Sequence, residues 1–250
     1  MAGLAFVYVA TGERYIAEAQ QSARSCRLQM PACRLLLLTP DAVEPDGFDE
    51  VIPFAGGISD PFELKIAGMA AVAEERFVFL DTDTYALDSV EDIGDLLDRF
   101  DLAAAQAPVR LQSYLWPETA KFLVAAPSCF PELNTGVIGF KRGPAVAEML
   151  ARWLELYREH ARQVPPPRTQ DQASFREVVY MSGLRLATLP PEYNCRFPYP
   201  SGLCGPVKML HGRADAPALE EMGRALNRSR DFRAVNRDRF LRHSVLIKSR

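Results

Sequence analysis

The sequence predicts a single α/β domain in which helices flank a central sheet. Apolar, strand-like runs alternate with helical stretches through residues 4–80, and this alternation is typical of layered α/β proteins. The run at residues 77–80 ends directly in Asp81-Thr82-Asp83, and open α/β sheets place their ligand sites where strands end. A chain of 250 residues, 48% of them hydrophobic, has enough apolar material for one core.

Composition excludes several classes of function. The formal net charge is −3, so nucleic acid, which favours a strongly basic surface, is not an expected partner. The five cysteines have no C-x-x-C spacing, which indicates reduced thiols in a cytoplasmic protein. The apolar start at Leu4–Val9 has no basic segment before it and is expected to be a strand rather than a signal peptide. No segment approaches transmembrane length.

The N-terminal part supplies most of the expected sheet. Strands are expected at Leu4–Val9, Arg34–Thr39, residues 51–54 and residues 77–80, and helices at residues 13–26 and 61–75. The second helix has clear start signals, because Asp60 suits the N-cap and Pro61 the first turn. Lys65 falls at the edge of its apolar stripe, so its ammonium group either reaches solvent or meets an anion in a cleft.

The acidic triplet is the strongest functional signal. Side chains two positions apart in a strand point the same way, so Asp81 and Asp83 are expected to face one cavity while Thr82 turns aside. Carboxylate oxygens suit Mg2+ or Mn2+, which usually bind through one or two carboxylates together with substrate phosphates. The alternative is structural, with Asp81 capping the next turn and Asp83 solvated.

The middle of the chain continues the alternation. An acidic amphipathic stretch at residues 89–100 leads to an expected strand at residues 102–107, and strand-forming residues return at 133–140. Gly143-Pro144 then opens a long amphipathic helix.

The C-terminal part contains two candidate site segments with structural alternatives. Thr169 and Gln172 form a capping box at the start of a helix, where Asp171 suits the helix dipole. A strand that begins at Leu186 is followed by a loop and by His211. A lone histidine is more often packed or solvated than a ligand, because one imidazole carries no geometry.

Seven short motifs occur in an order that resembles a known enzyme family. In chain order they are Ala10-Thr11 with Tyr15, Lys65, Asp81-Thr82-Asp83, Leu133-Asn134-Thr135-Gly136-Val137, Asp171-Gln172, Leu189-Pro190-Pro191-Glu192-Tyr193-Asn194 and His211-Gly212. The chain is similar to glycosyltransferases of the GT-A fold, in particular to the family that contains glycogenin and the bacterial lipopolysaccharide galactosyltransferases. The resemblance spans roughly residues 4–213. It implies a nucleotide-diphospho-sugar transferase domain with a twisted mixed sheet at residues 1–213, followed by a basic extension at residues 214–250.

The resemblance also implies an activity. Members of the family move a sugar from a nucleotide diphosphate donor, usually a UDP-sugar, and the expected acceptor is a glycan or a lipid-linked sugar, with retention of the anomeric configuration. Mn2+, or Mg2+ in its place, would be held by Asp81, Asp83 and His211 and would act as a Lewis acid. The other implied contacts follow the donor: Thr11 and Tyr15 at the base, Lys65 at the phosphates or the sugar, Asn134 and Thr135 beside the sugar, and Asp171 and Gln172 near the anomeric carbon. Gly212 is a further expected donor-binding residue.

The chain departs from the family's pattern in three places, of which Thr135 in place of the more usual serine keeps the hydroxyl. The family's late segment usually reads His-x-x-Gly-x-x-Lys-Pro, whereas this chain has His211-Gly212-Arg213-Ala214-Asp215, so Arg213 is the candidate for the missing cation. The Asn or Asp that often follows the first strand is replaced by Thr11-Gly12, which leaves the base specificity open.

Two other functions fit parts of the sequence. Residues 77–84 match the first motif of haloacid dehalogenase-like phosphatases, in which Asp81 would be the nucleophile and Asp83 an acid/base. The nearest candidate for the second acidic motif of such enzymes runs from Gly94 to Asp98. A non-catalytic nucleotide-sugar binding module would have a His211 segment that no longer completes the metal site.

The acceptor is expected to enter near residues 111–131 and 193–205. Aromatic side chains there could stack on sugar rings or fill the edge of the core: Tyr114, Trp116, Phe197 and Tyr199. After Leu210, ten Lys and Arg residues stand against five Asp and Glu. This bias predicts peripheral contact of the basic C-terminus with the inner face of the cytoplasmic membrane, where a lipid-linked acceptor would lie.

Overall fold

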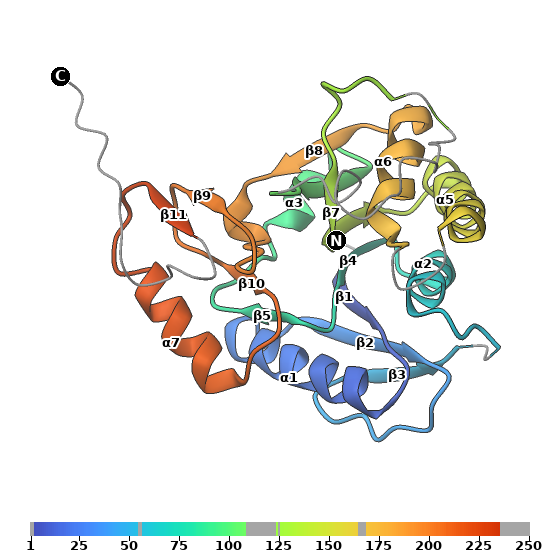
Figure 1. Cartoon of the computed structure of the whole chain (residues 1–250). Coiled ribbons are helices and arrows are strands. Elements are labelled where there is room, and N and C mark those ends of the chain that lie inside the picture. The colour runs from blue at the N-terminus through green and yellow to red at the C-terminus, as the bar shows by residue number, and fades with distance from the viewer. Residues whose placement is uncertain (1–2, 55–56, 109–123, 125, 165–168, 236–250) are drawn as a thin grey trace.

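The fold is built on a seven-stranded mixed sheet (Figure 1). The computed structural model describes residues 3–54, 57–108, 124, 126–164 and 169–235. The strand order is β3-β2-β1-β4-β7-β6-β8, and every neighbouring pair is parallel except the two made by β7. The strands are β1 (Leu4–Val9), β2 (Arg34–Thr39), β3 (Glu50–Pro53), β4 (Arg76–Leu80), β6 (Leu102–Gln106), β7 (Leu133–Lys141) and β8 (Leu186–Leu189). The predicted α/β class and mixed central sheet are therefore confirmed.

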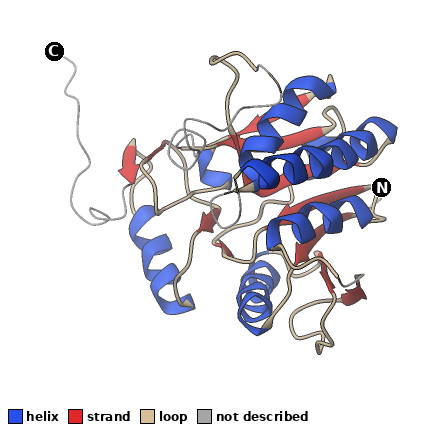
Figure 2. Ribbon diagram, turned by 45° about the vertical axis from the view of Figure 1, so that its right-hand side comes forward, coloured by secondary structure: helices blue, strands red, loops and turns tan. Residues whose placement is uncertain are grey.

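Helices cover both faces of this sheet (Figure 2). One face packs against α2 (Pro61–Ala71), α5 (Pro144–Gln163) and α6 (Asp171–Ser182), and the other against α1 (Glu13–Gln29) and α3 (Ile93–Leu97). Along β1, Val7 points into the first core, whereas Phe6 and Tyr8 point into the second. Because both faces are buried, this strand reads as a continuous apolar run rather than an alternating one.

Two small antiparallel ladders lie beside the main sheet, and each contains at least one strand from the C-terminal part of the chain. One joins β5 (Thr84–Ala86) to β10 (Met209–His211), and the other joins β9 (Ser201–Leu203) to β11 (Arg233–Val235). Between them, α7 (Ala216–Leu226) packs through Leu219 into a third apolar cluster. The division predicted after residue 213 stays a prediction, although residues on both sides of it pack together in this cluster.

Several details differ from the sequence-based expectations. The second helix ends at Ala71 instead of reaching residue 75, and only Ile93–Leu97 of the stretch 89–100 is helical. Phe197 is buried in the third cluster, so it fills the core instead of facing a sugar. Tyr114 and Trp116 lie outside the described residues. Among the described helices, none has the length and apolar character that crossing a bilayer requires.

The topology brings distant segments to one edge of the sheet. The carboxyl ends of the parallel strands β1 and β4 lie at this edge, and β7, which runs the opposite way, begins there. The pairing of Leu80 with Val137 continues through a hydrogen bond of 2.8 Å from the amide of Asp81 to the carbonyl of Gly136. The acidic triplet after β4 therefore lies directly beside the first residues of β7.

Candidate active site

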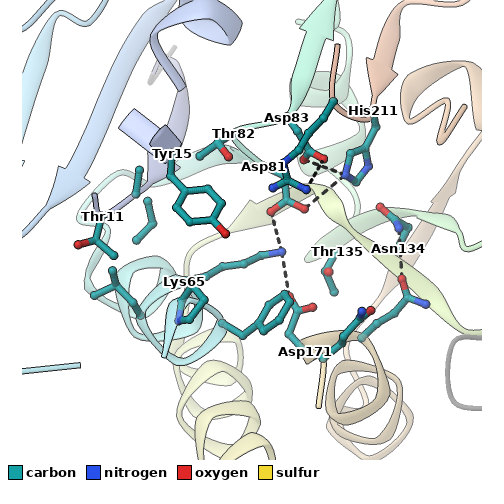
Figure 3. Close-up of a pocket in the computed structure, with 18 of the residues that line it drawn as sticks. Thr11, Tyr15, Lys65, Asp81, Thr82, Asp83, Asn134, Thr135, Asp171 and His211 are labelled. Atoms are coloured by element: carbon teal, nitrogen blue, oxygen red, sulfur yellow. Dashed lines mark hydrogen bonds and ion pairs between the residues drawn. The ribbon is translucent and has the colours of Figure 1, made fainter. Parts of the chain in front are cut away.

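A cavity of about 400 Å3 opens at this edge of the sheet, a volume within the usual range of small-molecule sites. Figure 3 shows side chains from β7, α1, α2 and α6 and from the loops after β1 and β4 converging on it. The lining includes all but one of the predicted site residues: Thr11, Tyr15, Lys65, Asp81, Asp83, Asn134, Thr135, Asp171, Gln172 and His211.

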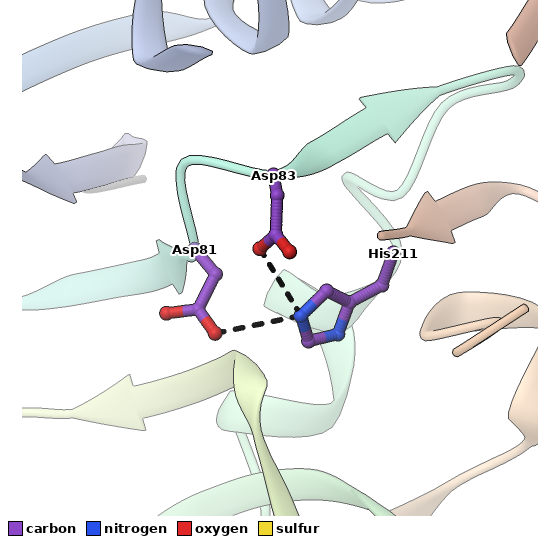
Figure 4. Close-up of side chains that lie close together, drawn as sticks. All are labelled: Asp81, Asp83 and His211. Carbon is purple, nitrogen blue, oxygen red and sulfur yellow. Dashed lines mark ion pairs between the residues drawn. The ribbon is translucent and has the colours of Figure 1, made fainter. Parts of the chain in front are cut away.

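Asp81, Asp83 and His211 form a compact group of potential metal ligands (Figure 4). One ligand atom from each lies within 4.8 Å of the others, and Nε2 of His211 is 3.5 Å from Oδ2 of Asp81 and 3.3 Å from Oδ1 of Asp83. Ligands held about 2.1 Å from an ion at right angles lie about 3 Å apart. Two carboxylates and one imidazole at this spacing fit a divalent ion such as Mn2+ or Mg2+.

The two aspartates face the cavity because of a turn, not because of strand alternation. β4 ends at Leu80 and β5 starts at Thr84, and the amide and the hydroxyl of Thr84 both donate to the carbonyl of Asp81, at 3.2 and 2.8 Å. Thr82 lies between them at the border of the cavity, and its hydroxyl donates a hydrogen bond of 3.2 Å to Glu18 of α1, which is not among the lining residues. That Thr82 turns aside from the two aspartates stays a prediction.

The glycine at position 136 is explained by the close approach of His211. A methyl group at this position would lie 2.5 Å from Nδ1 and 2.8 Å from Nε2 of His211. The imidazole therefore packs directly against the backbone of β7, where only glycine leaves room for it. This contact, together with the pairing of His211 with Thr84, holds the ring beside the acidic triplet.

Lys65 points into the cleft and not to solvent. Its ammonium nitrogen lies 2.8 Å from Oδ1 of Asp81 and 2.8 Å from Oδ2 of Asp171, and the side chain is 8% exposed. Burial lowers the pKa of Lys65, but the charges of Asp171 and Asp81 raise it more, so the net shift is upward. Burial raises the pKa of Asp81, and the opposing charge of Lys65, with His211, holds it below its usual range.

Asp83 lies among three basic groups. Besides His211, its carboxylate faces Arg196 at 3.4 Å and Arg213 at 3.5 Å. Burial raises the pKa of Asp83, but the charges of His211 and of the two arginines, with a hydrogen bond from His211, hold it well below its usual range. Arg213, the candidate for the missing cation, thus reaches the cavity, and its guanidinium also lies 5.7 Å from the ring centre of Tyr15.

The charges of the cavity are balanced. Three cations and three carboxylates line it: Lys65, Arg196, Arg213, Asp81, Asp83 and Asp171. A divalent ion bound by the aspartates would leave a net positive charge, which complements the negative charge of a diphosphate.

The first residues of α6 enter the cavity, but not through the predicted capping box. The helix begins at Asp171, its N-cap is Gln170, and no side chain caps it. The amide of Gln172 instead accepts a hydrogen bond of 3.2 Å from Asn134 and donates one to Glu132. The capping-box interpretation of Thr169 and Gln172 is therefore wrong, because buried polar partners on the sheet engage the glutamine first.

Two glycine positions near the cavity have structural explanations. Thr11 and the amide of Gly12 both donate to Asp41, at 3.1 and 2.7 Å, so this aspartate holds the turn after β1. Gly212 lies outside the cavity lining. Its amide donates to the carbonyl of Asp83 at 2.8 Å, and with φ at +149° a side chain there would meet Phe197. The donor contact expected of Gly212 stays a prediction.

Several solved structures of glycosyltransferases are similar to this chain. The bifunctional glycosyltransferase WbbM in its apo form has 15% identity, with a TM-score of 0.56 over 86% of this chain and 46% of that chain. GlyE from Streptococcus pneumoniae TIGR4 has 16% identity, with a TM-score of 0.55 over 86% and 55%. The galactosyltransferase LgtC in complex with donor and acceptor sugar analogs has 16% identity, with a TM-score of 0.52 over 84% and 87%. The chain has a GT-A glycosyltransferase fold.

This GT-A chain spans about half the length of the WbbM and GlyE chains. No family model and no curated protein matches its sequence.

The arrangement does not fit the phosphatase alternative. Asp98, in the candidate second acidic motif, does not line the cavity. It is exposed after the end of α3, where it accepts a hydrogen bond of 2.7 Å from Arg76. Arg76 begins β4, whereas Asp81 follows its end. The two acidic motifs therefore lie at opposite ends of the same strand, too far apart to share an ion.

Sequence reasoning missed several residues around the site of this GT-A chain. Arg196 belongs to no motif, and only its position two residues after Asn194 could have drawn attention to it. Glu18, Asp41 and Glu132 support Arg213, Thr11 and Gln172 from outside the expected segments. Their roles depend on neighbours that are distant in the chain.

Proposed function

We propose that this protein is a metal-dependent glycosyltransferase that moves a sugar from a nucleotide diphosphate donor, a UDP-sugar, to a carbohydrate or lipid-linked acceptor. The observation that carries the proposal is the meeting of Asp81, Asp83 and His211 in one cavity of a GT-A fold. A divalent ion there would supply a Lewis acid for the leaving diphosphate.

The residues around this group have the charges that the reaction needs. Breaking a glycosyl phosphate bond develops negative charge on the diphosphate and positive charge at the anomeric carbon. Lys65, Arg196 and Arg213 lie where they can offset the first charge, and the oxygens of Asp171 and Gln172 can stabilise the second. We propose retention of the anomeric configuration, with Asp171 and Gln172 near the reacting carbon.

Tyr15 is the proposed stacking partner of the base. Tyr15 lines the cavity, and its ring lies on the side of Thr11 (Figure 3). Arg213 lies near the ring centre at 5.7 Å and pairs with Glu18 at 3.0 Å. One arginine would therefore touch both the base platform and the diphosphate, which ties base position to phosphate position.

The acceptor and the place of action extend the proposal. LgtC was solved with donor and acceptor sugar analogs, and we propose the same two classes of ligand for this cavity. Contact of the basic C-terminal segment with the inner face of the cytoplasmic membrane also stays a proposal. A vesicle-binding assay tests this contact: anionic vesicles should retain the protein at low salt and release it at high salt.

Thermal unfolding with UDP, GDP and common nucleotide sugars, each with and without Mn2+, tests the function. A ligand at about a hundred times its dissociation constant adds roughly 2.7 kcal/mol of stability, so a shift that requires both UDP and Mn2+ is the expected result. Absence of any shift would refute the proposal. Tight donor binding without hydrolysis or transfer would identify a binding module.

Asp81→Asn is the variant that tests the metal assignment. It should remove the Mn2+-dependent part of the shift and leave the fold intact, because Lys65 keeps its second carboxylate partner, Asp171, at 2.8 Å. An unchanged Mn2+-dependent shift in this variant would remove the assignment.

A further inference from the structure

Five buried side chains are hydrogen-bonded in series from the proposed metal group into the interior. Nδ1 of His211 lies 2.7 Å from Oδ1 of Asn194, whose Nδ2 donates to Oδ1 of Asn134 at 2.8 Å. Nδ2 of Asn134 donates to Oε1 of Gln172 at 3.2 Å, and Nε2 of Gln172 donates to Glu132. All five residues are at most 7% exposed, so water cannot readily replace these partners.

The backbone fixes the direction of this series. The amide of Gly136 donates to Oδ1 of Asn134 at 3.0 Å, and a backbone N–H can only donate. The oxygen of Asn134 must therefore face Gly136, and the group of Asn194 that meets the same oxygen must be its NH2. No other assignment of the two amides gives every contact a donor and an acceptor.

The consequence reaches His211. With its NH2 engaged by Asn134, Asn194 presents only its carbonyl oxygen to Nδ1 of His211, and an oxygen there can only accept. Nδ1 must carry a hydrogen. Nε2 is then the nitrogen that can offer a lone pair, and it is the one that faces Asp81 and Asp83.

The same series of hydrogen bonds fixes the orientation of the Gln172 amide, at the end opposite to His211. Asn134 has its oxygen on Gly136 and Asn194, so its NH2 points to Oε1 of Gln172, and the NH2 of Gln172 points to Glu132. One side chain, Asn134, thus orients both the proposed metal ligand and the proposed catalytic amide.

We propose that Asn194 and Asn134 are positioning residues, which hold His211 in its Nδ1–H form and Gln172 in a single amide orientation through one directed series of hydrogen bonds. The part that concerns metal affinity rests on the proposed function, whereas the tautomer does not. Asn194 is itself placed by the backbone, because Cys195 forms a bridge with Leu210 and accepts from the amide of His211 at 2.9 Å.

The first test reads the tautomer in the wild-type protein without metal. The nitrogen shifts of the His211 ring, assigned by comparison with His211→Gln, should show a hydrogen on Nδ1. A ring with its hydrogen on Nε2 alone would overturn the inference, whether or not the protein is a transferase.

The second test measures Mn2+ affinity by electron paramagnetic resonance in the presence of UDP. Asn194→Ala should weaken Mn2+ binding by about tenfold to a hundredfold, as expected when a metal ligand loses its supporting hydrogen bond, and should mix the tautomers. Asn194→Asp keeps the acceptor for His211 but loses the donor to Asn134, so it should preserve the hydrogen on Nδ1 and disturb Gln172.

Asn227→Ala is the matched control. Asn227 is exposed, and its amide accepts from and donates to the backbone of the buried Val207 at 2.8 and 3.0 Å, away from the cavity. It should lower stability and leave Mn2+ affinity unchanged. If Asn194→Ala binds Mn2+ as the wild type does, with the same tautomer, the positioning role is wrong. If the wild type itself binds no Mn2+, the proposed function fails, and the tautomer alone decides the inference.

Discussion

Removing the ammonium group of Lys65 should destabilise the protein more than any loss of a surface charge. In Lys65→Met, the carboxylates of Asp81 and Asp171, each 2.8 Å from the lost nitrogen, would face each other without a cation. Asp171 is 4% exposed, so it cannot recover its solvation. Breaking a buried pair by removing one partner costs about 3–5 kcal/mol, and we expect a loss in this range at neutral pH.

The pH dependence of this loss follows from the direction of the pKa shift. The pKa of Asp81 is lowered in the folded protein, with burial opposing and the charge of Lys65 favouring the shift. The stabilisation by Lys65 is therefore present above the unfolded pKa of about 3.9 and disappears as the pH falls through the folded value. The difference between Lys65→Met and wild type should shrink on acidification, as protonation removes the unpaired charge.

Urea unfolding at several pH values measures this difference. Arg24→Met serves as the control, because Arg24 pairs with Asp46 while both side chains are more than half exposed, and solvent reduces such a pair to about 0.5 kcal/mol or less. Lys65→Met combined with Asp171→Asn should recover part of the loss, since the unpaired buried charge is gone. The reasoning is refuted if Lys65→Met costs no more than Arg24→Met at neutral pH.

Three further predictions follow from other features. In Gly136→Ala, the added methyl group should displace the ring of His211. Calorimetry should then detect no Mn2+ binding, and urea unfolding should show a loss of about 1–3 kcal/mol of stability. Retained Mn2+ affinity would contradict the close contact. Arg213→Met should raise the dissociation constant for UDP with Mn2+ by about tenfold, the effect of one lost charge-assisted contact. Fluorescence titration measures this constant, with Arg24→Met as the control. Equal UDP affinities of the two variants would exclude Arg213 from the donor site. Thiol titration of the folded protein should detect the exposed Cys129 and Cys204, and unfolding should make the three buried thiols reactive. Burial raises the pKa of one of them, Cys26, to about 12. Fast reaction of more than two thiols in the folded protein would be inconsistent with this packing.

Much of the fold was predictable because its signals are local. Continuous apolar runs predict the buried strands, and Asp60 does cap α2 through hydrogen bonds to the amides of Phe62 and Glu63. The short strands of the small ladders were not predicted, because β5 and β10 have three residues each and owe their existence to pairing across more than a hundred positions.

The candidate site divides in the same way. The motif order placed the expected residues, and the structure gathers them in one cavity, except for Gly212. The directed series through Asn194 was beyond sequence reasoning, since it depends on which nitrogen and oxygen atoms meet in the folded interior. Thr169 and Gln172 show the opposite case, where a convincing local signal loses to a tertiary partner.

The ladder between β5 and β10 also sets the timing of site formation. Thr84 pairs with His211 and Tyr85 with Leu210, so the third ligand of the proposed ion arrives on a strand made long after the two aspartates. During synthesis, Asp81 and Asp83 can take their places beside β7 while the histidine is still absent. A divalent ion held there would therefore gain its nitrogen ligand only after β10 has paired with β5.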